Sequence, residues 1–497
     1  MTYDIKLTGS FHTTVDHGVS GTTTWSASGR STSVGAVVTA LMVSLHAHLH
    51  AQHAATLWIV PGVDGLLTAL LTDHYELTMV QAALARGTAH RRSVFEVFAR
   101  RLPDGRRYGV VAGTGRLLDA IERFRFTDDA LADLQRRRVV DEPTLSWLAD
   151  YRFHGDIWGY AEGDCYFPYS PLLIVEGTFA EAVVLETLVL SVLNFDSAIA
   201  SAASRMTAAA GDRPCIEMGS RRTHEWAAVA AARAAYIAGF ASTSNLEAGR
   251  SYGVPTRGTS AHSFTLLHDQ ERDAFTAQVD SLGKGTTLLV DTYDVSAAVA
   301  LGVEVAGPEL GAVRLDSGDL LTQAYEVRAQ LDALGASNTR IIVTSDLDEH
   351  AIAALAVAPV DAYGVGTALV TGSGAPTAGF VYKLVARSAE DGAMVSVAKK
   401  SLDKASVGGR KYALRRRSPQ GVAEAEVLGV GSAPVTDHDD RSLLVQLIRD
   451  GKVVGREPLS AARERHRAAR DELPPTALQM SHGEPAIATI YEQNGNR

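Results

Sequence analysis

The chain has 497 residues, of which 46% are hydrophobic and 21% are charged, and its net charge is −10. This composition is typical of a soluble globular enzyme, and the acidic balance excludes the broad basic field that nucleic-acid binding requires. At roughly 100–200 residues per domain, the length predicts either several domains or one large barrel with additions.

The number of cysteines and the hydropathy of the chain indicate where the protein is located. The two cysteines, Cys165 and Cys215, lie far apart and predict neither a disulfide framework nor a cysteine metal site, which favours the cytoplasm. No run reaches the ~18–20 uninterrupted apolar residues of a membrane-spanning helix. The apolar run at residues 34–45 lies too far from Met1 for an ordinary signal peptide. We therefore expect no membrane partner.

Residues 1–65 differ in composition from the rest of the chain. A Gly/Ser/Thr-rich stretch predicts a flexible leader, and the histidine-rich run LHAHLHAQH follows it. Such a tract can bind metal, but this one lacks the acidic or cysteine partners that would fix a geometry. We expect residues 1–65 to be either a disordered leader or an over-extended start that does not belong to the folded protein.

Residues 66–180 predict a mixed α/β domain. The segment from Leu66 to Gly87 carries apolar residues at helical spacing and ends in a glycine, a common helix C-cap. Alternating apolar residues on both sides of a Pro-Asp-Gly turn then predict strands. Amphipathic segments that follow predict helices.

Residues 181–385 contain a repeated pattern. Six short strand-like runs each close on polar residues: PCIEMGSRR, GVPTRGTSAHS, TTLLVDTYD, GAVRLDSGD, RIIVTSDLDE and VDAYGVGTAL. They recur at about 20–40 residues, the span of a βα unit. Such repeats build a doubly wound open sheet or a barrel, and polar residues at so many strand ends favour an irregular α/β barrel.

The remaining residues complete the expected architecture. Residues 386–455 are strand-rich and basic, and we expect this β-rich portion to pack on the N-terminal domain. The fold class is then α/β, an irregular α/β barrel plus a mixed α/β sandwich-like domain built from N- and C-terminal segments. Residues 456–497 predict a helical segment and a tail.

Polar side chains that are suited to catalysis or ligand binding gather at the predicted strand ends. The set is Arg221, Arg222, Thr259, His262, Asp291, Arg314, Asp316, Ser317, Asp319, Asp346 and Thr367. Singly, each has an ordinary explanation, such as a helix N-cap, a core histidine or a solvated arginine. Their shared position indicates an active site. Guanidinium groups suit a carboxylate or phosphate ligand, whereas the lack of lysine argues against a Schiff-base aldolase.

Two loops at these ends have the composition that binds a phosphorylated sugar. The RLDSGDL turn holds Asp316, Ser317, Gly318 and Asp319. Its carboxylates suit ribose hydroxyls or Mg²⁺, and equally suit a helix cap. The glycine-rich GVGTALVTGSGAP stretch around Gly366 and Thr367 lets backbone N–H groups approach an anion. Neither loop is a Walker A motif, and no strand–GxGxxG–helix unit is present.

Together these segments resemble nicotinate phosphoribosyltransferases. The resemblance is carried over residues 66–385 by LLTDHYELTM, FEVFARRLP, EMGSRR, TSNLEAGRSYGVPTRGTSAHSF, LLVDTYD, VRLDSGDL, SDLDE, YGVGTALVTG and FVYKLV. It implies that nicotinate is joined to phosphoribosyl pyrophosphate (PRPP), with ATP hydrolysis, giving nicotinate mononucleotide and pyrophosphate for NAD. It also implies a homodimer whose active sites are shared between subunits.

The resemblance also assigns roles to single residues. It implies that His262 accepts phosphate from ATP as a phosphohistidine, with Arg221 and Asp316 also catalytic. The nicotinate contacts it implies are Tyr75, Thr259 and Arg314, with Tyr75 coming from the partner subunit. The PRPP contacts it implies are Arg222, Ser317, Gly318, Gly366 and Thr367. Mg²⁺ on the pyrophosphate would be oriented by Asp316 and Asp319. Met218 stands where the family often has Phe, beside the expected ring site.

Three rival functions remain open at this point. A nicotinamide-using relative places an Asp near the position of Ser244, which cannot supply that charge, so we favour the free acid. Quinolinate-using relatives are shorter and need more basic residues for a second carboxylate. A non-catalytic barrel that senses a nucleotide would not need Arg221, His262, Arg314 and Asp316 together.

Overall fold

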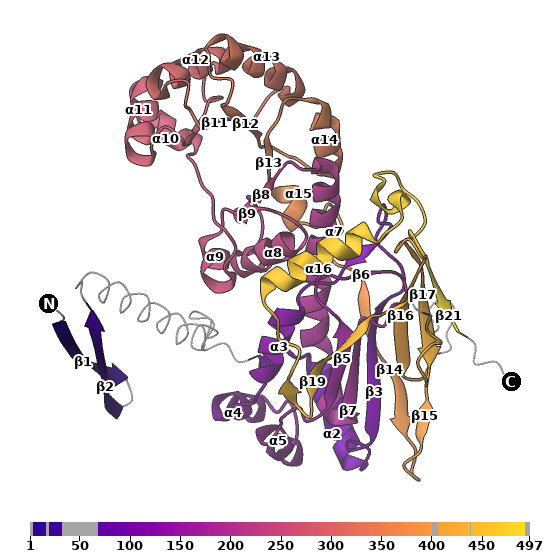
Figure 1. Cartoon of the computed structure of the whole chain (residues 1–497). Coiled ribbons are helices and arrows are strands. Elements are labelled where there is room, and N and C mark those ends of the chain that lie inside the picture. Colours follow the sequence, from indigo (N-terminus) through magenta and orange to yellow (C-terminus); the bar gives the residue numbers. More distant parts are fainter. Residues whose placement is uncertain (1–2, 16–18, 32–67, 400–405, 438, 493–497) are drawn as a thin grey trace. The chain divides into compact units, whose positions relative to one another are not determined.

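The computed structural model describes residues 3–15, 19–31, 68–399, 406–437 and 439–492. The chain divides into two compact units, Met1–Leu66 and Leu67–Arg497. In the first unit β1 (Tyr3–Val15) and β2 (Val19–Ser31) pair as an antiparallel hairpin (Figure 1). Composition led us to expect a flexible leader, but the threonines in these strands are β-branched and favour extended backbone. The histidine-rich tract lies outside the described residues.

A seven-stranded sheet is built from the N-terminal and C-terminal segments of the second unit. Its strand order is β15-β14-β3-β7-β5-β19-β20. The strands are β3 (Arg92–Ala99), β5 (Asp156–Tyr160), β7 (Leu173–Thr178), β14 (Phe380–Ser388), β15 (Met394–Ser396), β19 (Leu444–Arg449) and β20 (Lys452–Val453). Because β14 pairs antiparallel with β3 and β19 with β5, N- and C-terminal segments share one sheet. The predicted boundary at residues 385/386 falls inside β14.

Helices line this sheet, and a second sheet adjoins it. The helices before the barrel are η1 (Ala69–Leu71), α2 (His74–Ala85), α3 (Thr114–Glu122), α4 (Asp128–Arg136), α5 (Glu142–Ala149) and α6 (Phe179–Val183). The second sheet holds β18 (Arg441–Ser442), β16 (Lys411–Arg417), β17 (Ala423–Val430) and β21 (Ala488–Tyr491), and a two-stranded sheet holds β4 (Gly109–Val110) and β6 (Cys165–Tyr166). A buried 2.5 Å ion pair from Lys411 to Glu96 joins β16 to β3.

The predicted α/β barrel at residues 181–385 is built on a six-stranded sheet in which every pairing is parallel. Its order is β10-β11-β12-β13-β8-β9. The strands are β8 (Cys215–Glu217), β9 (Ser242–Thr243), β10 (Thr287–Leu289), β11 (Ala312–Leu315), β12 (Arg340–Val343) and β13 (Ala362–Val365). The sheet is curved but open between β9 and β10, so it is a half-barrel (Figure 1). All six strand ends therefore open on one rim.

Helices between and beyond these strands complete the βα units. They are α8 (Glu225–Ile237), α9 (Leu246–Tyr252), α10 (His262–Leu266), α11 (Glu271–Leu282), α12 (Val295–Ala306), α13 (Leu320–Ala333), α14 (Glu349–Ala354), η2 (Leu355–Val357) and α15 (Thr367–Val370); α16 (Leu459–Asp471) and η3 (Pro475–Leu478) follow later. Figure 1 shows α11 to α14 on the outside of the curved sheet. Apolar side chains from these helices and strands form its core.

One of the six predicted strands is wrong. The GVPTRGTSAHS segment makes only an isolated bridge from Thr256 to Thr243, and the strand that completes the sheet is the two-residue β9. Pro255 lacks an amide donor, and Gly253 has a φ of +68°, so the segment cannot continue a ladder. It is a loop that delivers the chain to α10.

Helix α7 (Glu186–Ala210) ties the half-barrel to the seven-stranded sheet. Together with α6 it spans Phe179–Ala210, which is long and apolar enough to cross a membrane, yet 67% of its most apolar window is buried inside the protein. Its Ser197 and Ser201 hydroxyls accept hydrogen bonds from the amides of Ala112 and Val110. The contacts are those of a core helix.

Candidate active site

The loops after β10, β11 and β12 are joined through two carboxylates. The side chain of Asp291 is buried, and its Oδ2 accepts hydrogen bonds from the Asp316 amide at 3.0 Å and the Ser317 hydroxyl at 2.7 Å. The Thr344 hydroxyl in turn donates to Asp316. Neighbouring parallel strands end at the same rim, so these bonds set the relative positions of the three loops.

His262 opens α10 and faces these carboxylates with its side chain 40% exposed. Its Nδ1 lies 3.1 Å from the Thr292 hydroxyl. Its Nε2 lies 3.9 Å from Asp291 Oδ1 and 3.8 Å from Asp316 Oδ2, which is beyond hydrogen-bond distance. One ring nitrogen is therefore held, while the other is open to a reacting group between two acids.

Arg314 contributes a cation close to the same two carboxylates. Its Nη1 donates to the Thr259 hydroxyl at 2.8 Å, and its buried Nε has no partner among the described residues. Burial lowers the pKa of the Arg314 guanidinium. The carboxylates of Asp316 and Asp291 offset part of this shift, and the positive charge of Arg221 adds to it. A partly desolvated guanidinium with an open donor is suited to a planar anion such as a carboxylate.

The loops after β8 and β13 lie side by side. The Met218 amide donates to the Val365 carbonyl at 2.8 Å. A Cβ atom at Gly364 would lie 2.8 Å from the Met218 sulfur, and one at Gly366 would lie 3.4 Å from the Met218 carbonyl oxygen, so glycine permits this approach. The exposed side chains of Arg221, Arg222 and Thr367 stand on these two loops.

Asp319 has a structural role in this chain. It N-caps α13, where its two carboxylate oxygens accept from the Thr322 amide at 3.3 Å and the Thr322 hydroxyl at 2.7 Å. These hydrogen bonds lower the pKa of Asp319. Within the part of the chain that the structure describes, no group of three or more His, Cys, Asp or Glu residues could hold a metal ion without other ligands. Gly318 has a φ of +87°, which the preceding turn requires.

Tyr75 lies away from the other predicted residues. It sits on α2 with 47% of its surface exposed, and burial together with Glu186 and Glu76 raises its pKa. Figure 1 shows α2 at the end of the second unit opposite to β11 and β12. A single chain therefore does not bring Tyr75 to His262.

Sequence reasoning missed two residues that orient the site and misjudged one turn. Thr292 holds the His262 ring and Thr344 holds Asp316, and both follow predicted strands, which was the available signal. The sequence predicts the Gly372–Gly374 turn to be part of the glycine-rich stretch that binds phosphate. Its Ser373 hydroxyl instead donates to Glu349 in the interior.

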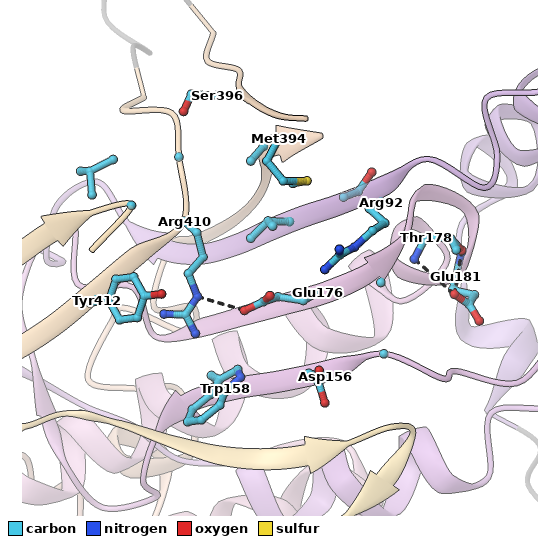
Figure 2. A pocket seen from close by; sticks show the side chains of 18 of the residues that line it. Arg92, Asp156, Trp158, Glu176, Thr178, Glu181, Met394, Ser396, Arg410 and Tyr412 are labelled. Carbon is cyan, nitrogen blue, oxygen red and sulfur yellow. Dashed lines mark hydrogen bonds and ion pairs between the residues drawn. The ribbon is translucent and has the colours of Figure 1, made fainter. Parts of the chain in front are cut away.

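A separate cavity of about 790 Å³ lies between the seven-stranded sheet and the adjoining ends of β16 and β17 in the second sheet (Figure 2). In it Arg410 pairs with Glu176 at 2.9 Å and stacks 4.0 Å from the Tyr412 ring. None of the predicted site residues lines this cavity. A second lining pair joins His154 to Glu181 at 2.9 Å.

Comparison with known proteins agrees with this geometry. Residues 70–194 match the nicotinate phosphoribosyltransferase (NAPRTase) N-terminal domain. The chain is 59% identical over 429 residues to nicotinate phosphoribosyltransferase pncB1 of Mycobacterium tuberculosis, covering 84% of this chain and 94% of that protein. It is 37% identical over 359 residues to nicotinate phosphoribosyltransferase of Bacillus subtilis, covering 70% and 73%.

Solved structures show the same relationship. The crystal structure of human nicotinic acid phosphoribosyltransferase superposes with a TM-score of 0.74 at 25% identity, covering 85% of this chain and 98% of that chain. Nicotinate-nucleotide pyrophosphorylase from Pyrococcus furiosus shares the fold, with a TM-score of 0.68 at 23% identity over 83% and 98%. The chain belongs to the nicotinate phosphoribosyltransferase family.

Proposed function

We propose that this chain is an ATP-dependent nicotinate phosphoribosyltransferase of NAD biosynthesis, which converts nicotinate and PRPP to nicotinate mononucleotide and pyrophosphate. The observation that carries the proposal is the convergence of His262, Arg314 and Asp316 on one half-barrel rim in a family member. The alternative of an inert nucleotide sensor gives no reason for an open imidazole nitrogen between two acids.

Nicotinate binds through its carboxylate to Arg314. The Thr259 hydroxyl engages Nη1, and among the described residues Nε has no partner, so a carboxylate can bind the Nε and Nη2 side of the guanidinium without displacing a protein acid. Tyr75 covers the pyridine ring from a second copy of the chain, which makes the enzyme a homodimer with shared sites. The support is that Tyr75 is exposed and remote from His262 within one chain.

PRPP binds across the loops after β8, β11 and β13. Its phosphates are held by Arg222 and by the Gly366–Thr367 turn, while Ser317 and Gly318 contact the ribose side. As pyrophosphate leaves, the ribosyl centre gains oxocarbenium character, and Arg221 and Asp316 stabilise the changing charge. The pyridine nitrogen of nicotinate is the nucleophile, so positioning does most of the work and no protein base is required.

Mg²⁺ supplies charge neutralisation to the leaving pyrophosphate when it is bound with PRPP. Asp316 has the hard oxygen ligands that this ion prefers, and its side chain is 38% exposed beside His262. Asp319 uses both carboxylate oxygens to cap α13. The metal role therefore rests on Asp316 and the substrate phosphates.

ATP is used through a phosphohistidine at His262. The Thr292 hydroxyl can accept a hydrogen bond from Nδ1–H, which keeps the proton on Nδ1 and leaves the Nε2 lone pair to attack the γ-phosphorus of ATP. An N–P bond forms as the bond to ADP breaks, and later attack by water releases phosphate and restores the imidazole. The added negative charge beside Asp291 and Asp316 alters the rim between the two steps. Both cysteines are free and buried, in keeping with a cytoplasmic enzyme.

Steady-state kinetics with nicotinate or nicotinamide, with and without ATP, test the proposal. We expect kcat/KM for nicotinate to exceed that for nicotinamide by at least about 100-fold, because Arg314 binds a carboxylate and not an amide. ATP is expected to stimulate turnover, and label from γ-³²P-ATP should map to the peptide that contains His262.

His262→Ala separates energy coupling from transfer. It should abolish both the ATPase activity and the stimulation by ATP, while slow ATP-independent transfer remains. Equal use of nicotinamide would contradict the substrate assignment. Undiminished ATP stimulation in the variant, or label on another peptide, would contradict the phosphohistidine.

A further inference from the structure

A buried charged cluster contacts the Gly372–Ser373 turn, which follows the short helix α15 that begins at Thr367. Glu349, the first residue of α14, accepts the Ser373 hydroxyl at 2.5 Å and Arg205 Nε at 3.0 Å, and pairs with Arg106 at 3.6 Å. All three charged side chains are at most 6% exposed. We call Arg106, Arg205, Glu349 and Ser373 the clamp. None of the clamp residues is among those that contact substrate in the proposed function.

The clamp fixes a strained turn. After the four residues of α15, Gly372 and Ser373 have φ values of +63° and +50°, and a Cβ atom at Gly372 would lie 2.3 Å from the Ala375 carbonyl oxygen. Positive φ is unfavourable for a residue such as Ser373 and persists only where surroundings hold it. Arg106 Nη2 donates to the Gly372 carbonyl at 2.8 Å, and Glu349 holds the neighbouring hydroxyl.

The same carboxylate joins two loops of the rim. Glu349 follows the loop after β12 that carries Asp346, whereas Ser373 closes the segment that begins at Thr367. The backbone continues this closure, because the Ser373 amide donates to the Ala368 carbonyl at 2.6 Å. Burial alone would raise the pKa of Glu349, but the Ser373 hydroxyl and Arg106 lower it below its usual value, so the carboxylate is charged.

We infer that Glu349 is a positioning residue that holds the Gly366–Thr367 turn in the geometry that binds the PRPP phosphate, acting through Ser373 and Arg106. This inference rests on the proposed function. Loosening the clamp widens the turn without removing any group that touches substrate. A binding loop displaced by a fraction of an ångström loses affinity for the group it holds while distant contacts stay intact.

The test is a split in kinetic constants. Glu349→Gln keeps the size and an acceptor for Ser373 but removes the charge that Arg106 and Arg205 share, so KM for PRPP should rise about tenfold. KM for nicotinate should stay within about twofold, because Arg314 and Thr259 lie on other loops. The Ki of ribose 5-phosphate as a competitor of PRPP should rise with KM. Ser373→Ala should act in the same direction with a smaller effect.

Glu426→Gln is the matched control. Glu426 is also fully buried, accepts Arg415 Nη2 at 2.6 Å and accepts a serine hydroxyl from Ser170, but it lies on β17 in the second sheet. It should lower the unfolding midpoint as Glu349→Gln does and leave KM for PRPP unchanged. An equal rise in KM for PRPP in the control would overturn the inference, because general loosening would then explain the effect.

Thr367→Val distinguishes the two levels of the argument. If the wild-type enzyme is active and Thr367→Val raises KM for PRPP while Glu349→Gln does not, the positioning role is wrong and the proposed function stands. If the wild-type enzyme does not join nicotinate to PRPP at all, the proposed function fails, and the inference fails with it. Parallel rises in KM for both substrates would also refute positioning.

Discussion

Arginines on the half-barrel rim and arginines in the junction around α7 differ in how completely they are paired. In the junction, Arg233 reaches both oxygens of Glu162 at 2.6 and 2.7 Å, and Arg441 reaches both oxygens of Asp164 at 2.7 and 3.0 Å. On the rim, Arg221 is exposed, and Arg314 keeps a buried Nε that has no partner within the part of the chain that the structure describes. An arginine whose donors are paired with a carboxylate therefore has a structural role. An arginine that keeps donors without such a carboxylate is available to bind a ligand.

The energetic consequence differs accordingly. Burial and pairing leave Glu162 with a lowered pKa and Arg233 with a raised one, because their mutual attraction and hydrogen bonds exceed the burial penalty. Removing one member of such a pair leaves a buried charge uncompensated. Removing an exposed arginine leaves no such charge, so its loss is visible in ligand binding and not in stability.

Arg233→Met should produce the largest loss of stability. The variant strands the buried carboxylate of Glu162 and removes the cation that stacks 5.4 Å from Tyr252, so unfolding should become easier by about 3–5 kcal/mol. Urea unfolding followed by tryptophan fluorescence measures this. Arg221→Met is the matched rim variant, and its free energy of unfolding should stay within about 0.5 kcal/mol of wild type while turnover falls. Equal loss of stability in both variants would remove the distinction between the two regions.

A pH dependence sharpens the comparison, because the junction also holds a neutral histidine. His466 is buried on α16 between the Ser204 hydroxyl and the Gly163 carbonyl. Burial lowers the pKa of His466 to about 4. The charges of Arg470 and Arg463 contribute to this lowering, whereas Asp164 opposes the shift. The unfolded chain then binds a proton below its ordinary pKa of 6.5 while the folded chain does not. Stability is therefore lost as the pH falls from 6.5 towards 4, by about 2 kcal/mol at pH 5.

His466→Gln isolates this contribution. Glu76 and Glu96 have pKa values raised to about 7 by burial, so they change stability in the opposite direction over part of the same range. The quantity to measure is thus the difference between wild type and variant in urea unfolding at pH 8 and pH 5. The wild type should lose more stability than the variant on acidification. Parallel losses would show that His466 is protonated in the folded state.

The sequence predicted the sheet of the half-barrel better than it predicted the contacts that support the rim. Five strands match because each is an apolar run closed by polar residues, whereas β9 has two residues and leaves no such pattern. The hydrogen bonds from Asp316 and Ser317 to Asp291 could be expected, because these residues follow two of the predicted strands. The clamp could not, since Arg106, Arg205, Glu349 and Ser373 are distant in the chain and only packing against α7 brings them together.

The smallest expected effect concerns Asp319, which tests whether a rim acid is structural. Its carboxylate caps α13, so Asp319→Ala should lower stability by about 1 kcal/mol. Asp319→Asn keeps an acceptor for the Thr322 amide and should recover most of that loss. In both variants the Mg²⁺ concentration for half-maximal activity should equal that of wild type, whereas Asp316→Asn should raise it. A shift of the Mg²⁺ dependence in Asp319→Asn, with stability intact, would return Asp319 to the metal site, because only loss of its charge distinguishes that variant from the wild type.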